Sequence, residues 1–355
     1  MNFQSFMTGI LHMNSDRVRN NMKTAYFWLT AKAKIIAEKL QSAYGGFIFE
    51  KDNLKENIRS AFYEYEALVF VMASGIAVRM ISEYISDKSH DPAVIVIDQN
   101  GEFVISLVSG HIGGANRLAR KLAGILNAAA VITTATDRAG IIAFDEFAAE
   151  NDTAIENLKE VRYISSHLLD GGKVDLITRL DTDISDKNIT VTSEYRGNTS
   201  VVLDTGMTVE NPVSHILYLR PRIIYIGTGC KKNTDTLYYE QCFIDFISSN
   251  HINPLSVKCM ATIALKENED CIVSLCRKYG YELKIISQSD ILKCGDIFEK
   301  SEFVEKITGV PSVAESSAYI ASGYGKILCR KTKYSGITFS LAQSEKFFRR
   351  NNDER

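Results

Sequence analysis

Hydrophobic and polar positions alternate in blocks that predict strands followed by helices over two long parts of the chain. Apolar runs at 24–30, 67–72 and 93–108 are typical of buried strands, and helical patterns follow the first two. The third run is interrupted by Gln-Asn-Gly at 99–101, which predicts a hairpin. A second series of strands and helices begins at residue 222 and closes with another predicted hairpin.

The pattern between these two parts weakens into short apolar runs with scattered glycines. We therefore predict an α/β fold: two α/β domains joined by a small, partly β linker module. The expected divisions are a poorly ordered extension over 1–22, an N-terminal α/β domain over 23–150, the linker module over 151–221, a C-terminal α/β domain over 222–345 and a polar tail over 346–355. A chain of 355 residues is long enough for two or three separate cores.

The stretch SLVSGHIGGANRLARKLAGIL, residues 106–126, predicts a strand, a tight turn with one histidine and three glycines, and an amphipathic helix. Glycine permits close approach to the backbone, and the first amides of a helix lack intrahelical partners. Residues 103–136 contain no acid that would offset the basic face of this helix. An anion or a polarised carbonyl is the expected ligand. The alternative is a glycine-rich turn that binds nothing.

Two further glycine turns follow predicted strands. Ser74-Gly75 leads into a helix that carries Arg79, and GTGCKKNT at 227–234 ends the strand that begins at residue 222. The second turn lacks the spacing of a P-loop and the third glycine of a dinucleotide-binding fingerprint, so ATP and NAD are poorly supported. Residues 215–234 again carry cations and no acid, which favours an anion at this strand end.

The composition narrows the classes of partner. A net charge of −2 gives no positive field for nucleic acid, and no apolar run approaches the roughly 20 residues that span a membrane, so we expect a cytoplasmic protein. All seven cysteines lie between Cys230 and Cys329 without a CxxC pair, which favours buried free thiols over a metal site. Cys230 is either a nucleophile or a packed, ligand-lining thiol.

Both predicted α/β domains thus present a glycine-rich strand end flanked by cations. A ligand that bridges them has to be large and to carry several negative groups. A polycarboxylate macrocycle fits this description, and so does a large nucleotide.

Several motifs together identify a family resemblance. VFVMASGIAVRMIS, DPAVIVID, SLVSGHIGGANRLA and VITTATDRAGIIAFD resemble the N-terminal domain of the cobalt-precorrin-5A hydrolases of anaerobic cobalamin biosynthesis, and IGTGCKKNT and GVPSVAESSA resemble their C-terminal domain. The resemblance covers residues 24–343. The chain departs from the family in its N-terminal extension, its polar tail and Asn233, where glycine is frequent in the family.

The resemblance implies an enzyme that opens the δ-lactone between the ring A acetate and C20, and then expels C20 with its methyl group as acetaldehyde to give cobalt-precorrin-5B. The implied substrate is an anionic cobalt-tetrapyrrole, and no cofactor is expected because the cobalt arrives within the substrate. A non-catalytic tetrapyrrole-binding or channelling protein and a nucleotide-dependent transferase remain alternatives. A homodimer and transient contact with neighbouring pathway enzymes stay open.

That chemistry needs an acid–base group, donors for an oxyanion and partners for peripheral carboxylates. We expect His111 to transfer the proton, because an imidazole titrates near neutral pH. Asp137 either holds His111 or a water, or caps a helix; Glu315 either assists catalysis or is a solvated acid at a helix start; Asn116 either caps its helix or contacts ligand. The predicted substrate-binding residues are Ser74, Gly75, Arg79, Ser109, Gly110, Gly113, Gly114, Asn116, Thr133, Thr134, Gly227, Gly229, Cys230 and Lys232.

Overall fold

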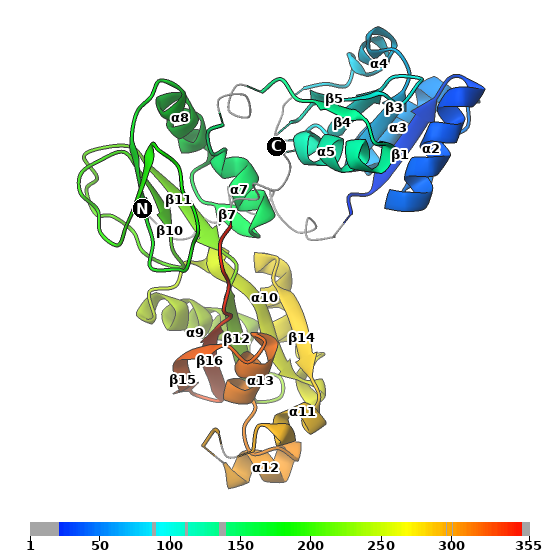
Figure 1. Cartoon of the computed structure of the whole chain (residues 1–355). Coiled ribbons are helices and arrows are strands. Elements are labelled where there is room, and N and C mark those ends of the chain that lie inside the picture. The colour runs from blue at the N-terminus through cyan, green and yellow to red at the C-terminus, as the bar shows by residue number, and fades with distance from the viewer. Residues whose placement is uncertain are drawn as a thin grey trace. The chain divides into compact units, whose positions relative to one another are not determined.

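The computed structural model describes residues 21–86, 90–110, 113–134, 140–295, 297–299 and 301–349 (Figure 1). These residues form three mixed β-sheets with helices packed on them, which confirms the predicted α/β class. The described chain divides into two compact units, one within 21–150 together with 165–172, and the other over 151–164 and 173–349. In this described part, no helix is long and apolar enough to cross a membrane.

The first sheet has the strand order β2-β1-β3-β4-β5-β6. Its strands are β1 (Thr24–Trp28), β2 (Phe47–Ile48), β3 (Ala67–Val71), β4 (Ala93–Ile97), β5 (Phe103–Val108) and β6 (Ala129–Val131). Strands β1 to β4 run parallel to one another, whereas β5 pairs antiparallel with β4 and β6 runs parallel to β5. The predicted hairpin is confirmed, and it reverses the chain direction inside the sheet.

Helices cover both faces of this sheet because alternate strand residues point to opposite sides. One face packs against α2 (Ala31–Tyr44) and α5 (Ala115–Leu126), where Val69 and Ile95 meet Leu40 and Leu118. The other face packs against α3 (Leu54–Glu64) and α4 (Ser74–Ile81). Helix α7 (Phe144–Glu150) follows in the same unit. The helices predicted after residue 31 and after Ser74 are confirmed.

The region predicted as a linker module contains a five-stranded sheet in the order β7-β11-β10-β8-β9. The elements here are β7 (Thr153–Ile155), α8 (Leu158–Leu169), β8 (Val174–Ile177), β9 (Ile189–Thr192), β10 (Ser200–Leu203) and β11 (Ile216–Pro221). Arg220 is fully buried, pairs with Glu156 at 2.5 Å and donates to the carbonyls of Asp204 and Met207. This module therefore has its own internal polar centre.

The third sheet has the order β14-β13-β12-β16-β15. Its strands are β12 (Ile224–Cys230), β13 (Val257–Ile263), β14 (Glu282–Ile286), β15 (Lys326–Tyr334) and β16 (Ile337–Gln343), and the last two form the predicted hairpin. Its helical segments are α9 (Thr236–Ser249), η1 (Pro254–Ser256), η2 (Ala264–Lys266), α10 (Asp270–Tyr279), α11 (Gln288–Lys293), α12 (Glu302–Thr308) and α13 (Ala314–Ala321). Ile226 packs in the cluster formed with α9 and α10, whereas the neighbouring Gly227 faces α13.

Parts of both predicted terminal segments are packed. Asn21 donates to the carbonyl of Tyr44 at 2.7 Å, and the amide of Met22 donates to the Tyr44 hydroxyl at 3.1 Å. Phe348 is fully buried and bridges to Thr182. Residues 346–349 therefore belong to the second compact unit, while 1–20 and 350–355 lie outside the described residues.

Candidate functional site

The β4–β5 hairpin separates two of the predicted glycine turns. Val71, at the end of β3, pairs with Ile97, whereas Val108, at the end of β5, pairs with Val94. Val94 and Ile97 are three positions apart in β4, a distance of about 10 Å along an extended strand. Ser74 and Gly75 therefore lie beyond the side of the sheet at which β4 ends. The turn after β5 begins at the opposite side, at which β4 starts. The predicted hairpin already implied this separation, because it reverses the strand direction.

The turn after β5 closes on its own backbone. Ser109 adopts a left-handed backbone with φ of 59°, and Gly114, at φ of 81°, is the N-cap of α5. The amide of Ala115 donates to the Ser109 carbonyl at 3.1 Å, and the amide of Asn116 donates to the Gly110 carbonyl at 2.9 Å. These two amides have no partner within the helix, as expected, but the loop supplies acceptors for both, so neither is free to bind a ligand.

Two glycines of this turn are required by the turn itself. A Cβ at Gly113 would lie 2.3 Å from the Cβ of Ser109, and one at Gly110 would lie 2.8 Å from Oδ1 of Asn116. Both approaches are far inside van der Waals contact. The turn therefore needs both glycines in order to fold back on itself, independently of any role in ligand binding.

Asn116 connects the turn to the segment that follows β6. Its side chain is buried, accepts a hydrogen bond from the Ser106 hydroxyl at 2.7 Å and donates to the Thr134 hydroxyl at 3.2 Å. Asn116 lies inside α5 and Gly114 occupies the N-cap, so the interpretation of Asn116 as a helix cap is wrong. Thr134 is brought to this turn, with Thr133 beside it in the chain.

His111 and Asp137 lie outside the described residues, so their side chains are not placed.

The basic side chains predicted on one face of α5 are partly neutralised, because Arg120 forms an ion pair with Glu146 of α7 at 3.3 Å. Within the described ranges, no group of three or more His, Cys, Asp and Glu side chains is arranged to hold a metal ion.

The glycines of β12 lie under helix α13. A Cβ at Gly227 would approach the carbonyl oxygen of Ala314 to 1.8 Å and the amide nitrogen of Ala318 to 2.7 Å. At Gly229 the nearest atom would be 3.7 Å away, on Val313. Gly227 is therefore explained by direct packing of the strand against the helix backbone.

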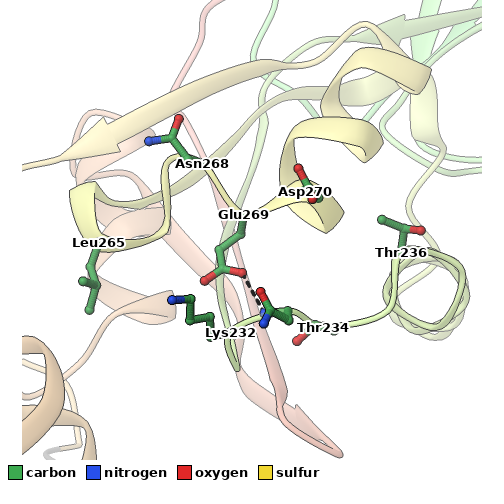
Figure 2. A pocket seen from close by; sticks show the side chains of 8 residues that line it. Lys232, Thr234, Thr236, Leu265, Asn268, Glu269 and Asp270 are labelled. Carbon is green, nitrogen blue, oxygen red and sulfur yellow. Dashed lines mark hydrogen bonds between the residues drawn. The ribbon is translucent and has the colours of Figure 1, made fainter.

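A pocket of about 500 Å³ opens where β12 ends (Figure 2). It is lined by Lys232, Asn233, Thr234, Thr236, Leu265, Asn268, Glu269 and Asp270. Figure 2 shows the Lys232 side chain directed toward Glu269, whose carboxylate accepts from the Asn233 amide at 3.2 Å and from Lys266 at 2.8 Å. Asn233 has φ of 57°, a left-handed backbone that favours glycine and tolerates asparagine. This geometry accounts for the departure from the family at Asn233.

The pocket acids are residues that the sequence interpretation missed. Residues 215–234 contain no acid, but Glu269 and Asp270 lie at the start of α10, beside the end of β12. The order of strands in the sequence could have indicated these acids. Strands β12 and β13 are parallel, and the segments that follow parallel strands meet at the same side of a sheet. The pocket therefore combines one lysine with two carboxylates, and its charge is not purely cationic.

Glu315 lies in the first turn of α13 and is 1% exposed, so its interpretation as a solvated acid is wrong. One carboxylate oxygen accepts from the amide of Lys331 at 3.3 Å and lies 3.7 Å from the Arg330 guanidinium. The other oxygen has no hydrogen-bond partner in the described structure. A buried carboxylate with an open acceptor position can receive a proton or a further hydrogen bond.

All seven cysteines lie within the described residues and none is in a disulfide. Cys230 is partly exposed at the end of β12, and its sulfur lies 3.7 Å from that of the buried Cys271 in the first turn of α10. The hydrogen bond with Cys271 lowers the pKa of Cys230, with a further contribution from Lys266. The same contact, together with burial, raises the pKa of Cys271.

Comparison with known proteins places these features in a family. Residues 56–137 match the family description "Cobalamin synthesis G N-terminal", and residues 224–342 match "Cobalamin synthesis G C-terminus". The cobalt-precorrin-5A hydrolase of Salmonella typhimurium is 33% identical over 322 residues, which cover 86% of this chain and 89% of that protein. The chain belongs to the cobalt-precorrin-5A hydrolase family. The cobalt-precorrin-5A hydrolase of Priestia megaterium is 30% identical over 299 residues, 80% of each chain.

A solved structure from Sulfolobus solfataricus, described as a cobalamin biosynthesis protein G homolog, is 23% identical. It covers 92% of this chain and 99% of its own, with a TM-score of 0.41. The two matched regions of this cobalt-precorrin-5A hydrolase family member include the turn after β5 and the pocket after β12.

Proposed function

We propose that this chain is a cobalt-precorrin-5A hydrolase. The observation that carries the proposal is the relationship to two proteins of that name, which spans at least four-fifths of each chain. The reaction that we assign adds water to an anionic cobalt-tetrapyrrole, opens the ring A δ-lactone and releases C20 with its methyl group as acetaldehyde. The remaining macrocycle is cobalt-precorrin-5B.

For the N-terminal part of the site, we propose that His111 transfers the proton and that Asp137 supports it. The hydrogen bonds of Ser109 and Gly110 to α5 fix the chain directly before His111. Asn116 bonds both to Gly110 and, through its side chain, to Thr134, which precedes Asp137 by three residues. One buried residue thus links the two segments that carry the proposed acid–base pair, through its backbone amide on one side and its side chain on the other.

The buried Ser109 hydroxyl is the proposed donor to a substrate oxygen. It has no hydrogen-bond partner among the described residues, and it is held in a left-handed backbone that costs energy for a residue with a Cβ. Strained residues of this kind are enriched at functional sites. A hydroxyl without a partner can donate to an oxyanion as the lactone opens.

For the C-terminal part, we propose that Lys232 and the pocket amide and hydroxyl groups bind peripheral groups of the macrocycle. Glu269 and Asp270 share this pocket, so it suits amide- or hydroxyl-bearing contacts as well as a carboxylate held by Lys232. Glu315 stays a proposed proton acceptor through its open oxygen. Ser74 and Gly75 are not part of the proposed catalytic turn, because they follow the other edge of the first sheet.

The test is anaerobic incubation of the purified chain with cobalt-precorrin-5A, with acetaldehyde measured through a coupled alcohol dehydrogenase. We expect stoichiometric acetaldehyde from the wild-type chain. In His111→Ala, release at saturating substrate should fall by roughly 10² to 10⁴ with little change in substrate affinity, as is usual for loss of a general acid–base group. Ser109→Ala, which leaves His111 in place, is the matched variant for the donor role.

Tight binding of the substrate without acetaldehyde from the wild-type chain would refute the hydrolase assignment and favour a binding or channelling protein. Normal turnover of His111→Ala at saturation would remove His111 from proton transfer. In that case Asp137→Asn becomes the variant that decides which group acts.

A further inference from the structure

The two cysteines at the end of β12 and the start of α10 form a pair that the proposed hydrolysis does not use. The sulfur atoms of Cys230 and Cys271 are 3.7 Å apart, although 41 positions separate them in the chain. A disulfide has a sulfur–sulfur distance of about 2.05 Å, so the sulfurs need to approach by about 1.6 Å to bond. Side-chain rotation supplies movements of this size.

The members of the pair differ in access and in acidity. Cys230 is partly exposed, whereas Cys271 is 2% exposed. The contact between them lowers the pKa of the Cys230 thiol and raises that of Cys271, so the accessible sulfur is the better thiolate. Thiolates react with oxidants, and an accessible thiolate beside a second thiol is the arrangement of a redox-sensitive pair.

The other buried cysteines provide the contrast. Burial raises the pKa of Cys259 and of Cys276 to about 12, which keeps both thiols protonated at neutral pH. Cys276 belongs to the same helix as Cys271. The pKa of Cys271 is raised as well, so Cys271 differs from Cys276 in its contact with Cys230 and not in its own acidity.

We propose that Cys230 and Cys271 are a reversible oxidation site, in which peroxide converts the pair into an intramolecular disulfide. In the first step the Cys230 thiolate attacks hydrogen peroxide, the O–O bond breaks, and Cys230 becomes a sulfenic acid with release of hydroxide. In the second step the Cys271 sulfur attacks the Cys230 sulfur, the S–O bond breaks, and the Cys271 proton and the departing hydroxide form water. Two electrons pass from the two thiols to the peroxide, and a dithiol reductant reverses the change.

The bridge would join two elements that line the pocket. Cys230 lies two residues before Lys232, and Cys271 directly follows Asp270. Oxidation would hold the end of β12 against the first turn of α10 and so fix the spacing between the lysine and the carboxylate. The oxidation site is thus placed to alter the pocket without a change in any residue that lines it.

The experiment uses the reduced full chain, exposed to a tenfold excess of hydrogen peroxide, after which remaining thiols are alkylated and the protein is digested for mass spectrometry. We expect loss of two of the seven thiols, a mass decrease of two hydrogens, and one linked peptide pair that contains Cys230 and Cys271. Dithiothreitol should restore all thiols. Cys276→Ser, a matched change in the same helix, should form the same bridge.

The single variants test the order of steps. Cys271→Ser should leave Cys230 as a sulfenic acid that dimedone traps, and Cys230→Ser should leave Cys271 fully alkylatable. The proposal is overturned if the wild-type chain keeps seven thiols, if Cys230 accumulates oxygen while Cys271 remains reduced, or if the linked peptides contain another cysteine. None of these readouts depends on hydrolase activity.

Discussion

Replacing Gly227 by alanine tests whether this glycine serves packing or substrate binding. The added Cβ would lie 1.8 Å from the carbonyl oxygen of Ala314, whereas Cβ atoms do not come closer than 3.0 Å to other heavy atoms that they contact. Helix α13 must therefore move away from β12 by about 1.2 Å, since both partners at the contact are backbone and neither can rotate aside.

The cost follows from what that displacement disturbs. The buried residues Ala314, Ala318 and Ala321 of α13 lie on the sheet, and gaps of 0.5–1 Å already remove a quarter to a half of the dispersion attraction between facing atoms. Overpacking of a well-packed core usually costs about 1–3 kcal/mol, and a backbone clash belongs at the upper end. We expect Gly227→Ala to lower the free energy of unfolding by about 3 kcal/mol, which lowers the melting temperature by about 6–12 °C for a unit of this size.

Gly229→Ala is the matched control. It lies on the same strand and the same face, but its Cβ would meet nothing closer than 3.7 Å. We expect the free energy of unfolding of this variant to lie within about 1 kcal/mol of the wild-type value, because alanine loses less backbone entropy than glycine on folding. Urea unfolding followed by circular dichroism, together with thermal melts, measures both variants.

Equal stability of Gly227→Ala and wild type would refute the packing argument. A loss of substrate affinity in Gly227→Ala at unchanged stability would assign this glycine to ligand contact instead. Equal destabilisation of both variants would show that strand β12 itself needs glycine at both positions, independently of the close approach of α13.

Three further predictions concern the first sheet and the charged contacts. Asn116→Ala should destabilise the chain by about 2–3 kcal/mol in urea unfolding, because the buried Asn116 side chain is removed and its half-buried partners Ser106 and Thr134 lose their hydrogen bonds; a loss under 0.5 kcal/mol contradicts this. Burial by itself raises the pKa of Asp98, but the hydrogen bonds that its carboxylate accepts from backbone amides lower the pKa more, so that it lies below the ordinary 3.8. The carboxylate therefore stabilises the fold above pH 3.8, and the stability difference between wild type and Asp98→Asn should vanish as the pH falls further; a pH-independent difference contradicts this. Lys232→Ala should weaken substrate binding more at low than at high salt in titrations, because screening reduces such contacts; a salt-independent loss indicates packing.

Local patterning accounts for most of the elements that were predicted. The hairpin at 99–101, the strands on both sides of the middle region and the helix after the turn at 109–114 depend on side-chain period and turn residues. Those signals act over two to five residues, so the sequence carries them in full. The middle region was harder to interpret, because its strands have four residues or fewer apart from β11.

The candidate site depended more on long-range arrangement. The strand and helix after residue 222 could be predicted, and with them the position of Lys232 at a strand end. The pocket itself needs α10 to bring Glu269 and Asp270 beside that strand end. The approach of Cys271 to Cys230 arises in the same way.

By itself the sequence determined which segments form strands and helices, where the chain turns, and which family the chain belongs to, because periodicity and motif spacing are properties of neighbouring residues. Tertiary structure alone decided that Glu146 pairs with Arg120, that Glu315 is buried, and that Cys271 lies beside Cys230. Burial and charge pairing depend on which surfaces meet in space. In this chain those surfaces come from segments that are tens of residues apart.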